Sequence, residues 1–155
     1  PDSILRKGGS LTPAELQVMQ THPVLGTEIV TGNPWLQEAA VIIRHHHERL
    51  DGKGYPDGLR GEEIPLIARI FAVVDVFDAL TSERSYKSPM GLDEAMQIIL
   101  HESGSHFDPR IATAFMDIAP ALYVTITQAE TNELRQRLHE ALLRYFKLGV
   151  LPPVV

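Results

Sequence analysis

The chain has 155 residues, of which 44% are hydrophobic, and a formal net charge of −6. This size and composition fit one soluble domain, or a large part of one, that can bury a core. With no cysteine, the chain has neither a disulfide framework nor a thiolate metal site, and a reducing cytoplasmic location is expected. No segment reaches the ~18 apolar residues of a membrane span. The acidic balance, without a basic stripe, excludes DNA or RNA as an expected partner.

The first part of the chain predicts short helices that lead to a histidine cluster. Residues 1–10 show no helical period and are interpreted as a connector. Thr12 and Glu15 form a capping box, which predicts a helix to about residue 21. Pro23 then restarts a short helix to about residue 29. The Asn33-Pro34 pair opens a third helix, whose apolar stripe reaches the histidines at 45–47.

The remainder alternates between breakers and apolar helices. Residues 48–64 hold four glycines and a proline, which predicts a long irregular loop. Helices are expected at 66–80, 92–100 and 109–118, whereas the β-branched stretch 121–126 is ambiguous. A second capping box, at Thr127 and Glu130, predicts a last helix. This helix is expected to pack through Leu134, Leu138, Leu142 and Tyr145, against this domain or a second copy of the chain. The fold class is therefore all-α, with a domain at 1–120 and a helical extension and tail at 121–155.

The histidines at 45–47 are the first candidates for chemistry. Successive helical residues are rotated by ~100°, so His46 and His47 cannot reach one point from regular helix geometry. They could bind two neighbouring metals, or a single metal where the helix frays, while His45 is expected to face elsewhere. The alternative is a solvated helix end, where imidazolium is favoured by the helix dipole. His22, before Pro23, is by itself interpreted as structural.

Two acidic residues stand out in the apolar helix predicted at 66–80. Asp75 has apolar neighbours on nearly every side, and an unpaired buried carboxylate is costly, so a metal is the favoured partner. Asp78 is expected to make a structural hydrogen bond. For both, the alternative is capping or an ion pair with Arg69 or Arg84. Histidine and carboxylate ligands without sulfur suit iron, manganese or zinc. Two such metal ions ~3.5–4 Å apart can support the attack of water on a phosphate ester.

Arg84 and Lys87 follow the same helix. Arginine can hold a phosphate through two hydrogen bonds, and lysine adds a point charge. The alternative is charge complementarity with the helix C-terminus.

The string His-His-Glu-x-x-Asp-Gly-x-Gly-Tyr-Pro at 46–56 resembles the signature of the HD-GYP family, bacterial phosphodiesterases of cyclic di-GMP in the HD superfamily. Further landmarks of that family follow in the expected order over residues 1–119: Asp2-Ser3-Ile4-Leu5, Leu11-Thr12, His22-Pro23, the stretch from Arg69 to Asp78, and Phe107-Asp108-Pro109. The resemblance implies an HD-type helical bundle with a long irregular Gly-Tyr-Pro loop.

The resemblance also implies roles for particular residues. His22, His46, His47 and Asp75 correspond to metal ligands, and Arg84 and Lys87 to residues that hold the substrate phosphates. No catalytic residue beyond the metal ligands is identified. Iron or manganese is expected rather than zinc, in a site that holds two or three metals in the intact family. The Gly54-Tyr55-Pro56 loop is implied to contact diguanylate cyclase domains.

Two departures from the family pattern bear on function. Ser85 stands where the family usually has proline. The His-Asp pair that names the family, with its following lysine, is expected just before a stretch like Pro1-Asp2-Ser3-Ile4-Leu5, and the chain contains no His-Asp dipeptide. The chain is therefore expected to carry the C-terminal part of the site and to have little activity by itself. Without the preceding helices, apolar surface at the 66–80 helix would be exposed, and the chain is expected to repack or to form a homodimer that covers it. The alternative function is a non-enzymatic module that binds a nucleotide or a partner through the Gly-Tyr-Pro loop.

Overall fold

The structure is a computed structural model that describes residues 2–33, 36–83, 88–129 and 131–146, with the side chains of Tyr145 and Phe146 left out. In this part of the chain every regular element is a helix, apart from one isolated bridge between Ser103 and Phe107. The predicted all-α fold is confirmed. The chain divides into two compact units, Pro1–Asp117 and Ile118–Val155, and each is described by itself. Among the described residues, no helix combines the length and apolar character that crossing a membrane requires.

Three short helices begin the first unit: α1 (Asp2–Leu5), α2 (Pro13–Met19) and α3 (His22–Thr31). The connector predicted at 1–10 therefore contains one helical turn. The capping box before α2 is confirmed, since the Glu15 amide donates to the Thr12 hydroxyl at 3.3 Å and the Thr12 amide donates to the Glu15 carboxylate at 2.7 Å. Lys7 also binds this carboxylate, at 2.5 Å, so the turn that follows α1 is held to the start of α2.

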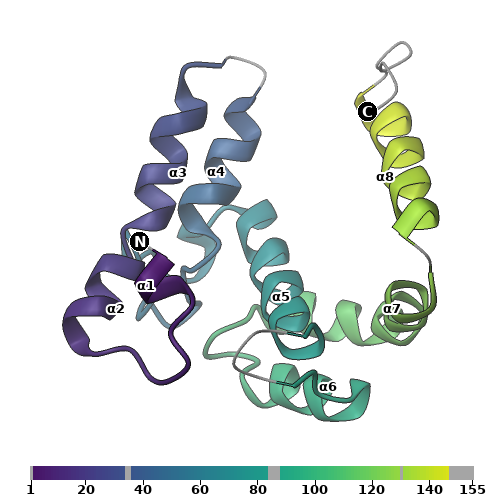
Figure 1. Cartoon of the computed structure of the whole chain (residues 1–155). Helices are drawn as coiled ribbons and strands as arrows, with labels where there is room; N and C mark the ends of the chain where they lie inside the picture. The colour runs from purple at the N-terminus through teal and green to yellow at the C-terminus, as the bar shows by residue number, and fades with distance from the viewer. Residues whose placement is uncertain (1, 34–35, 84–87, 130, 147–155) are drawn as a thin grey trace. The chain divides into compact units, whose positions relative to one another are not determined.

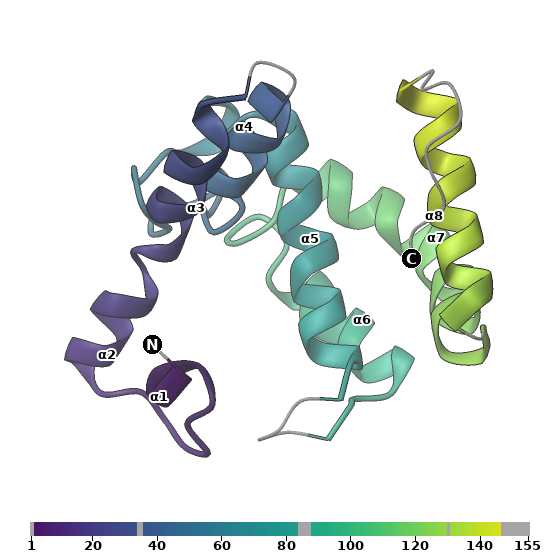
Figure 2. The same cartoon turned by 45° about the horizontal axis from the view of Figure 1, so that its top comes forward.

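Helix α3 lies alongside α4 (Gln37–His45), as both views show (Figures 1 and 2). Gly26 makes this close approach feasible, because a Cβ atom there would lie only 2.8 Å from Cγ2 of Ile43. Helix α5 (Leu66–Thr81) contacts α4 in turn. Between α4 and α5 runs the predicted irregular loop, whose only regular part is a 3-10 turn at Gly61–Glu63.

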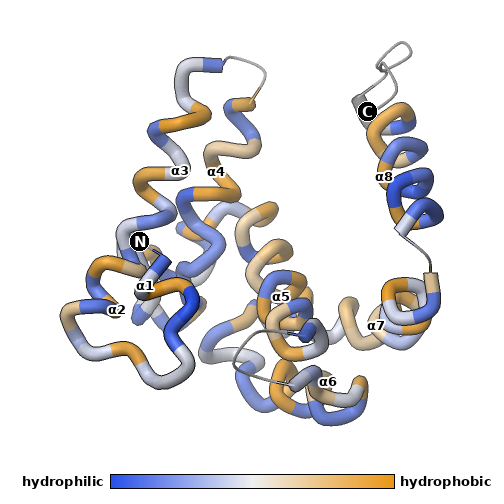
Figure 3. Tube along the Cα trace, in the orientation of Figure 1, coloured by the Kyte–Doolittle hydropathy of each residue, from blue (hydrophilic) through white to orange (hydrophobic). Residues whose placement is uncertain are grey.

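The core of the first unit lies where α5 meets α6 (Leu92–His101) and the beginning of α7 (Pro109–Gln128). Phe77 and Phe115 meet edge to face there, with ring centroids 5.0 Å apart. Helix α5 is mostly hydrophobic (Figure 3), and on its other face the apolar side chains are 41–57% exposed. The residues buried in this core are Ile64, Ala68, Ala72, Val73, Phe77, Ala95, Ile99, Phe107, Ala112 and Phe115.

The second unit differs from the predictions in the end of α7 and in the start of the last helix. Helix α7 does not end at residue 118 but continues to Gln128, so the ambiguous stretch 121–126 is helical. The reason is that the hydroxyls of Thr125 and Thr127 donate to the carbonyls of Ala121 and Tyr123, at 2.9 and 2.7 Å, and so are satisfied within the helix. Thr127 is therefore no N-cap, and Glu130 lies outside the described residues.

Helix α8 runs over Thr131–Phe146 and is mostly hydrophilic (Figure 3). The sequence predicts that it packs through Leu134, Leu138, Leu142 and Tyr145, against this domain or a second copy of the chain. Leu138 is 61% exposed, so the second unit does not bury this residue, and its packing against a second copy stays a prediction. Leu134 and Leu142 are half-buried, and the Tyr145 side chain lies outside the described part. The polar composition of the helix explains the result, because too few of its side chains gain from burial.

Candidate metal centre

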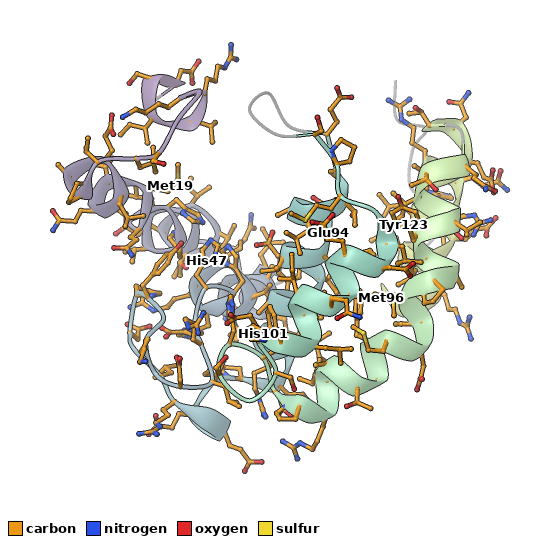
Figure 4. The ribbon with its side chains drawn as sticks, turned by 90° about the horizontal axis from the view of Figure 1, so that it is seen from below. Met19, His47, Glu94, Met96, His101 and Tyr123 are labelled. Carbon is orange, nitrogen blue, oxygen red and sulfur yellow. The ribbon has the colours of Figure 1, made fainter. Side chains whose placement is uncertain are left out.

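Three histidines, one from the start of α3 and two from just after the end of α4, meet in the first unit. His22 is the first residue of α3, and His46 and His47 directly follow the last residue of α4, His45. One ring nitrogen from each lies within 4.8 Å of the other two. Figure 4 labels His47, together with Met19 from the neighbouring α2. The geometry fits the alternative in which the helix ends and frees both histidines to face one point, with ring centroids 4.1 Å apart.

The hydrogen bonds of His22 and His46 fix which ring nitrogen is free. Nδ1 of His22 contacts the carbonyl of Met19, and Nδ1 of His46 contacts that of Ile43, both at 2.8 Å. A carbonyl only accepts, so each Nδ1 must carry the proton. In the neutral ring Nε2 then keeps a lone pair, and these two Nε2 atoms lie 3.4 Å apart. Two facing lone pairs at this distance can share a proton or bind a metal ion, and a carbonyl-oriented imidazole is typical of a metal ligand.

His47 completes the group as a neutral base. Its pKa is lowered from 6.5 to about 3, first by burial and then by the positive charges that His46 and His22 would carry. At neutral pH the ring is uncharged, which is the form that binds a metal.

Tyr55 and Asp75 adjoin this group. The Tyr55 ring stacks on that of His47, with centroids 4.8 Å apart. Burial, and then the negative charge of Asp75, raise the pKa of the Tyr55 hydroxyl to about 12. Asp75 is half-buried on α5, and Phe71, one turn before it, meets the His46 ring edge on at 6.0 Å. Asp75 thus lies on the part of α5 that faces the histidines, but its carboxylate does not belong to the group of ligand atoms that lie within 4.8 Å of one another.

The loop that follows His47 is organised by Glu48, which is only 2% exposed. Its carboxylate accepts the backbone amides of Asp57, Gly58 and Leu59 at 2.7, 3.1 and 3.0 Å. Gly54 is required next to it, because a Cβ atom there would lie 2.5 Å from the Glu48 Cα and 2.6 Å from the His47 carbonyl oxygen. Glu48 therefore shapes the loop that presents Tyr55 to His47.

A second group of potential ligands, His45, Glu48 and Asp57, is better explained as structural. The Glu48 oxygens are taken up by backbone amides, and Arg44 donates two hydrogen bonds to Asp57, at 2.8 and 2.6 Å. Nδ1 of His45 lies 3.4 Å from the same carboxylate. The prediction that His45 faces away from the other histidines is confirmed.

The remaining predicted charges divide into three cases. Arg84 and Lys87 lie outside the described residues. Asp78 accepts a hydrogen bond from Ser82 at 2.8 Å, as predicted. The alternative in which Arg69 pairs with Asp75 or Asp78 is not supported, since Arg69 donates to buried Asp108 at 2.6 Å.

The sequence predicts neither the role of Glu48, nor the stacking of Tyr55 on His47, nor the Arg69–Asp108 pair. A signal existed for Arg69, because a cation within an apolar helix requires a partner. For Glu48 no local signal exists, since its bonding partners are nine to eleven residues away.

The donor set of the histidine group fits a divalent metal. Neutral imidazole nitrogens suit iron, zinc and other borderline ions, and the nearby carboxylate of Asp75 suits harder ions such as manganese. The chemistry of such a centre is Lewis-acid activation of water and of phosphate oxygens.

Comparisons with known proteins agree with this geometry. The sequence profile of the family described as HD domain matches residues 1–111. The chain is 51% identical over 118 residues, 75% of its length, to the cyclic di-GMP phosphodiesterase response regulator RpfG of Xanthomonas campestris pv. campestris. It is 40% identical over 119 residues, 76% of its length, to the 3'3'-cGAMP-specific phosphodiesterase 2 of Vibrio cholerae.

A crystal structure of a cyclic GMP-AMP-specific phosphodiesterase of V. cholerae matches with a TM-score of 0.61 and 22% identity, over 86% of this chain and 35% of that one. This match shows the fold. The chain spans 31% of the Xanthomonas relative and 23% of the Vibrio relative. The chain belongs to the HD domain family and carries an HD-GYP-type domain.

Proposed function

We propose that the protein carrying this chain is a metal-dependent phosphodiesterase that hydrolyses cyclic di-GMP in bacterial second-messenger signalling. The observation that carries the proposal is the convergence of His22, His46 and His47, with two Nε2 atoms facing each other at 3.4 Å. The names of the relatives supply the substrate class, a cyclic dinucleotide.

In this proposal His22, His46, His47 and Asp75 hold iron or manganese, as part of a site with two or more ions. When bound, the metal would activate water and stabilise charge on the phosphoryl group. The chain's own contribution is to orient the ligands: backbone carbonyls fix the tautomers of His22 and His46, and the Tyr55 ring covers one face of His47. Arg84 and Lys87 would hold the substrate phosphates.

Further parts of the proposal concern the setting of the site. We place the HD-GYP domain at 1–120 and a C-terminal extension at 121–155, in a cytoplasmic bacterial protein. The Gly54-Tyr55-Pro56 loop is the proposed contact for diguanylate cyclase domains. A homodimer would cover the exposed apolar side chains of α5.

The test is hydrolysis of cyclic di-GMP by the full-length protein with added iron(II) or manganese(II). His46→Ala should lose turnover and bound metal together, because second and third ligands decide metal affinity. The matched control is His101→Ala, since His101 is exposed at the end of α6 and should leave both unchanged. Binding of the dinucleotide without turnover, at full metal content, would favour the non-enzymatic alternative. Residues 1–155 alone are expected to show little turnover.

A further inference from the structure

We infer that the groove between the α2–α3 turn and the Gly-Tyr-Pro loop is a purine subsite, in which Gln17 and Gln20 read the edge of one base of the cyclic dinucleotide. The inference rests on the proposed function and adds to it the residues that choose the base.

The groove has a volume of about 490 Å³ and borders the histidine group on two sides. Thr21, in its wall, directly precedes His22. Tyr55, in the opposite wall, stacks on His47. A nucleotide whose phosphate lies at the histidines would therefore have its base beside this groove.

The lining has the chemistry that a base requires. Val24, Leu25, Tyr55 and Pro56 give apolar and aromatic walls that suit the faces of a flat ring. The amides of Gln17 and Gln20 add polar groups, and in the described part of the chain neither amide makes a hydrogen bond to another residue. Each amide offers two donor hydrogens and an acceptor oxygen, which can pair with the mixed donor and acceptor edge of a purine.

Other small ligands fit the groove less well. Among the described residues no arginine or lysine lines it, so these residues offer a phosphate group no compensating charge for its lost hydration. The volume lies in the usual range for small-molecule sites. The comparison proteins are named for two cyclic dinucleotides, cyclic di-GMP and 3'3'-cGAMP, which differ in a single base. A subsite that reads a base is therefore where specificity would be decided.

The test compares GMP with ribose 5-phosphate, which share the sugar and phosphate but differ in the base. Binding to the full-length protein with manganese(II) is measured by calorimetry for the wild type and the double variant Gln17→Leu/Gln20→Leu. Loss of both amides should weaken GMP binding by about 25-fold, roughly fivefold for each hydrogen bond. Ribose 5-phosphate binding should stay the same. The control is Gln97→Leu, an exposed glutamine on α6, which should change neither.

A second variant tests which base is read. In Gln20→Glu the carboxylate can accept from both adjacent N–H groups of guanine, whereas adenine presents an acceptor nitrogen at that position. The affinity ratio of cyclic di-GMP to cyclic GMP-AMP should rise about tenfold. Unchanged GMP binding in the double variant, or an equal loss for ribose 5-phosphate, overturns the subsite even where the wild type hydrolyses cyclic di-GMP. A wild type that neither binds nor hydrolyses either dinucleotide overturns the proposed function, and the subsite with it.

Discussion

The irregular loop at 48–64 and the regular helix α8 contrast sharply in how they are held. The loop has one short 3-10 turn, yet Glu48 and Ile64 at its two ends are each 2% exposed. Helix α8 has sixteen residues in unbroken helix, and none of its described side chains is buried. Regularity and burial are therefore separate properties in this chain.

The difference lies in where the polar groups are satisfied. The loop amides of Leu50 and Asp51 donate to the carbonyls of His106 and Ser105 at 3.0 and 2.8 Å, which ties the loop to a distant segment. In α8 the clearest side-chain interaction joins Arg137 to Glu133 at 2.7 Å, with both side chains more than half exposed. An exposed pair of this kind contributes little to stability. Single changes should thus cost far more in the loop than in α8.

The largest effect is expected for Glu48→Ala. This change leaves three backbone amides without their acceptor, and each unsatisfied buried donor costs roughly 1–3 kcal/mol. The free energy of unfolding should fall by at least about 3 kcal/mol in urea titrations. Amide exchange at 57–59 should accelerate as well. Glu94→Ala, at an exposed carboxylate in the first turn of α6, is the control. A loss below about 1 kcal/mol would show that the loop is held by other contacts.

Gly54→Ala should come next. The added methyl would overlap the backbone at His47 and Glu48, so the loop must move, at a cost of about 1–3 kcal/mol. The Tyr55 ring should lose its stacking on His47, which near-ultraviolet circular dichroism can follow. Gly91→Ala is the matched control, because a Cβ atom there has no neighbour within 4 Å. Equal stability of both variants would contradict the close approach at Gly54.

Features with local causes were predictable from sequence. The capping box at Thr12 and the helix at 66–80 depend on residues a few positions apart, and both are present in the structure. The end of α7 was predicted wrongly because Thr127 satisfies its hydroxyl with a carbonyl four residues back, a choice that capping rules do not decide.

The candidate site divides in the same way. Family resemblance pointed to His22, His46 and His47, whereas helix geometry left open whether adjacent histidines can face one point. The helix end at His45 decides this, and it depends on the loop path fixed by Glu48. The Arg69–Asp108 pair joins residues 39 apart and could not be chosen over Asp75 or Asp78 from sequence alone.

A smaller, pH-dependent effect is expected from Asp108. This residue lies just after Ser105 and His106, the residues to which the loop amides are hydrogen-bonded. Hydrogen bonds from the side chain and the backbone amide of Arg110, and from the side chain of Arg69, lower the pKa of this buried carboxyl from 3.8 to about 2. The pKa of Asp108 is lower in the folded state than in the unfolded state. Its ionised carboxylate therefore stabilises the fold fully above about pH 4, and this stabilisation is lost as the pH falls toward 2. Its size is about 2 kcal/mol. Asp108→Asn should reduce this pH dependence between pH 4 and 2 in urea titrations, and a slope equal to wild type would contradict it.

The smallest effect is expected in α8, for Leu138→Ser. Leu138 is 61% exposed, so its removal should change the free energy of unfolding by less than about 0.5 kcal/mol. Ile99→Ala, in the equally regular helix α6 but fully buried, should cost about 2–4 kcal/mol and so isolates burial from helicity. Both variants are measured by urea unfolding over a hundredfold range of protein concentration. A loss for Leu138→Ser that grows with concentration would show that a second copy covers this face, because association adds to apparent stability by mass action. A concentration-independent loss of the size seen for Ile99→Ala would instead contradict the exposure of Leu138.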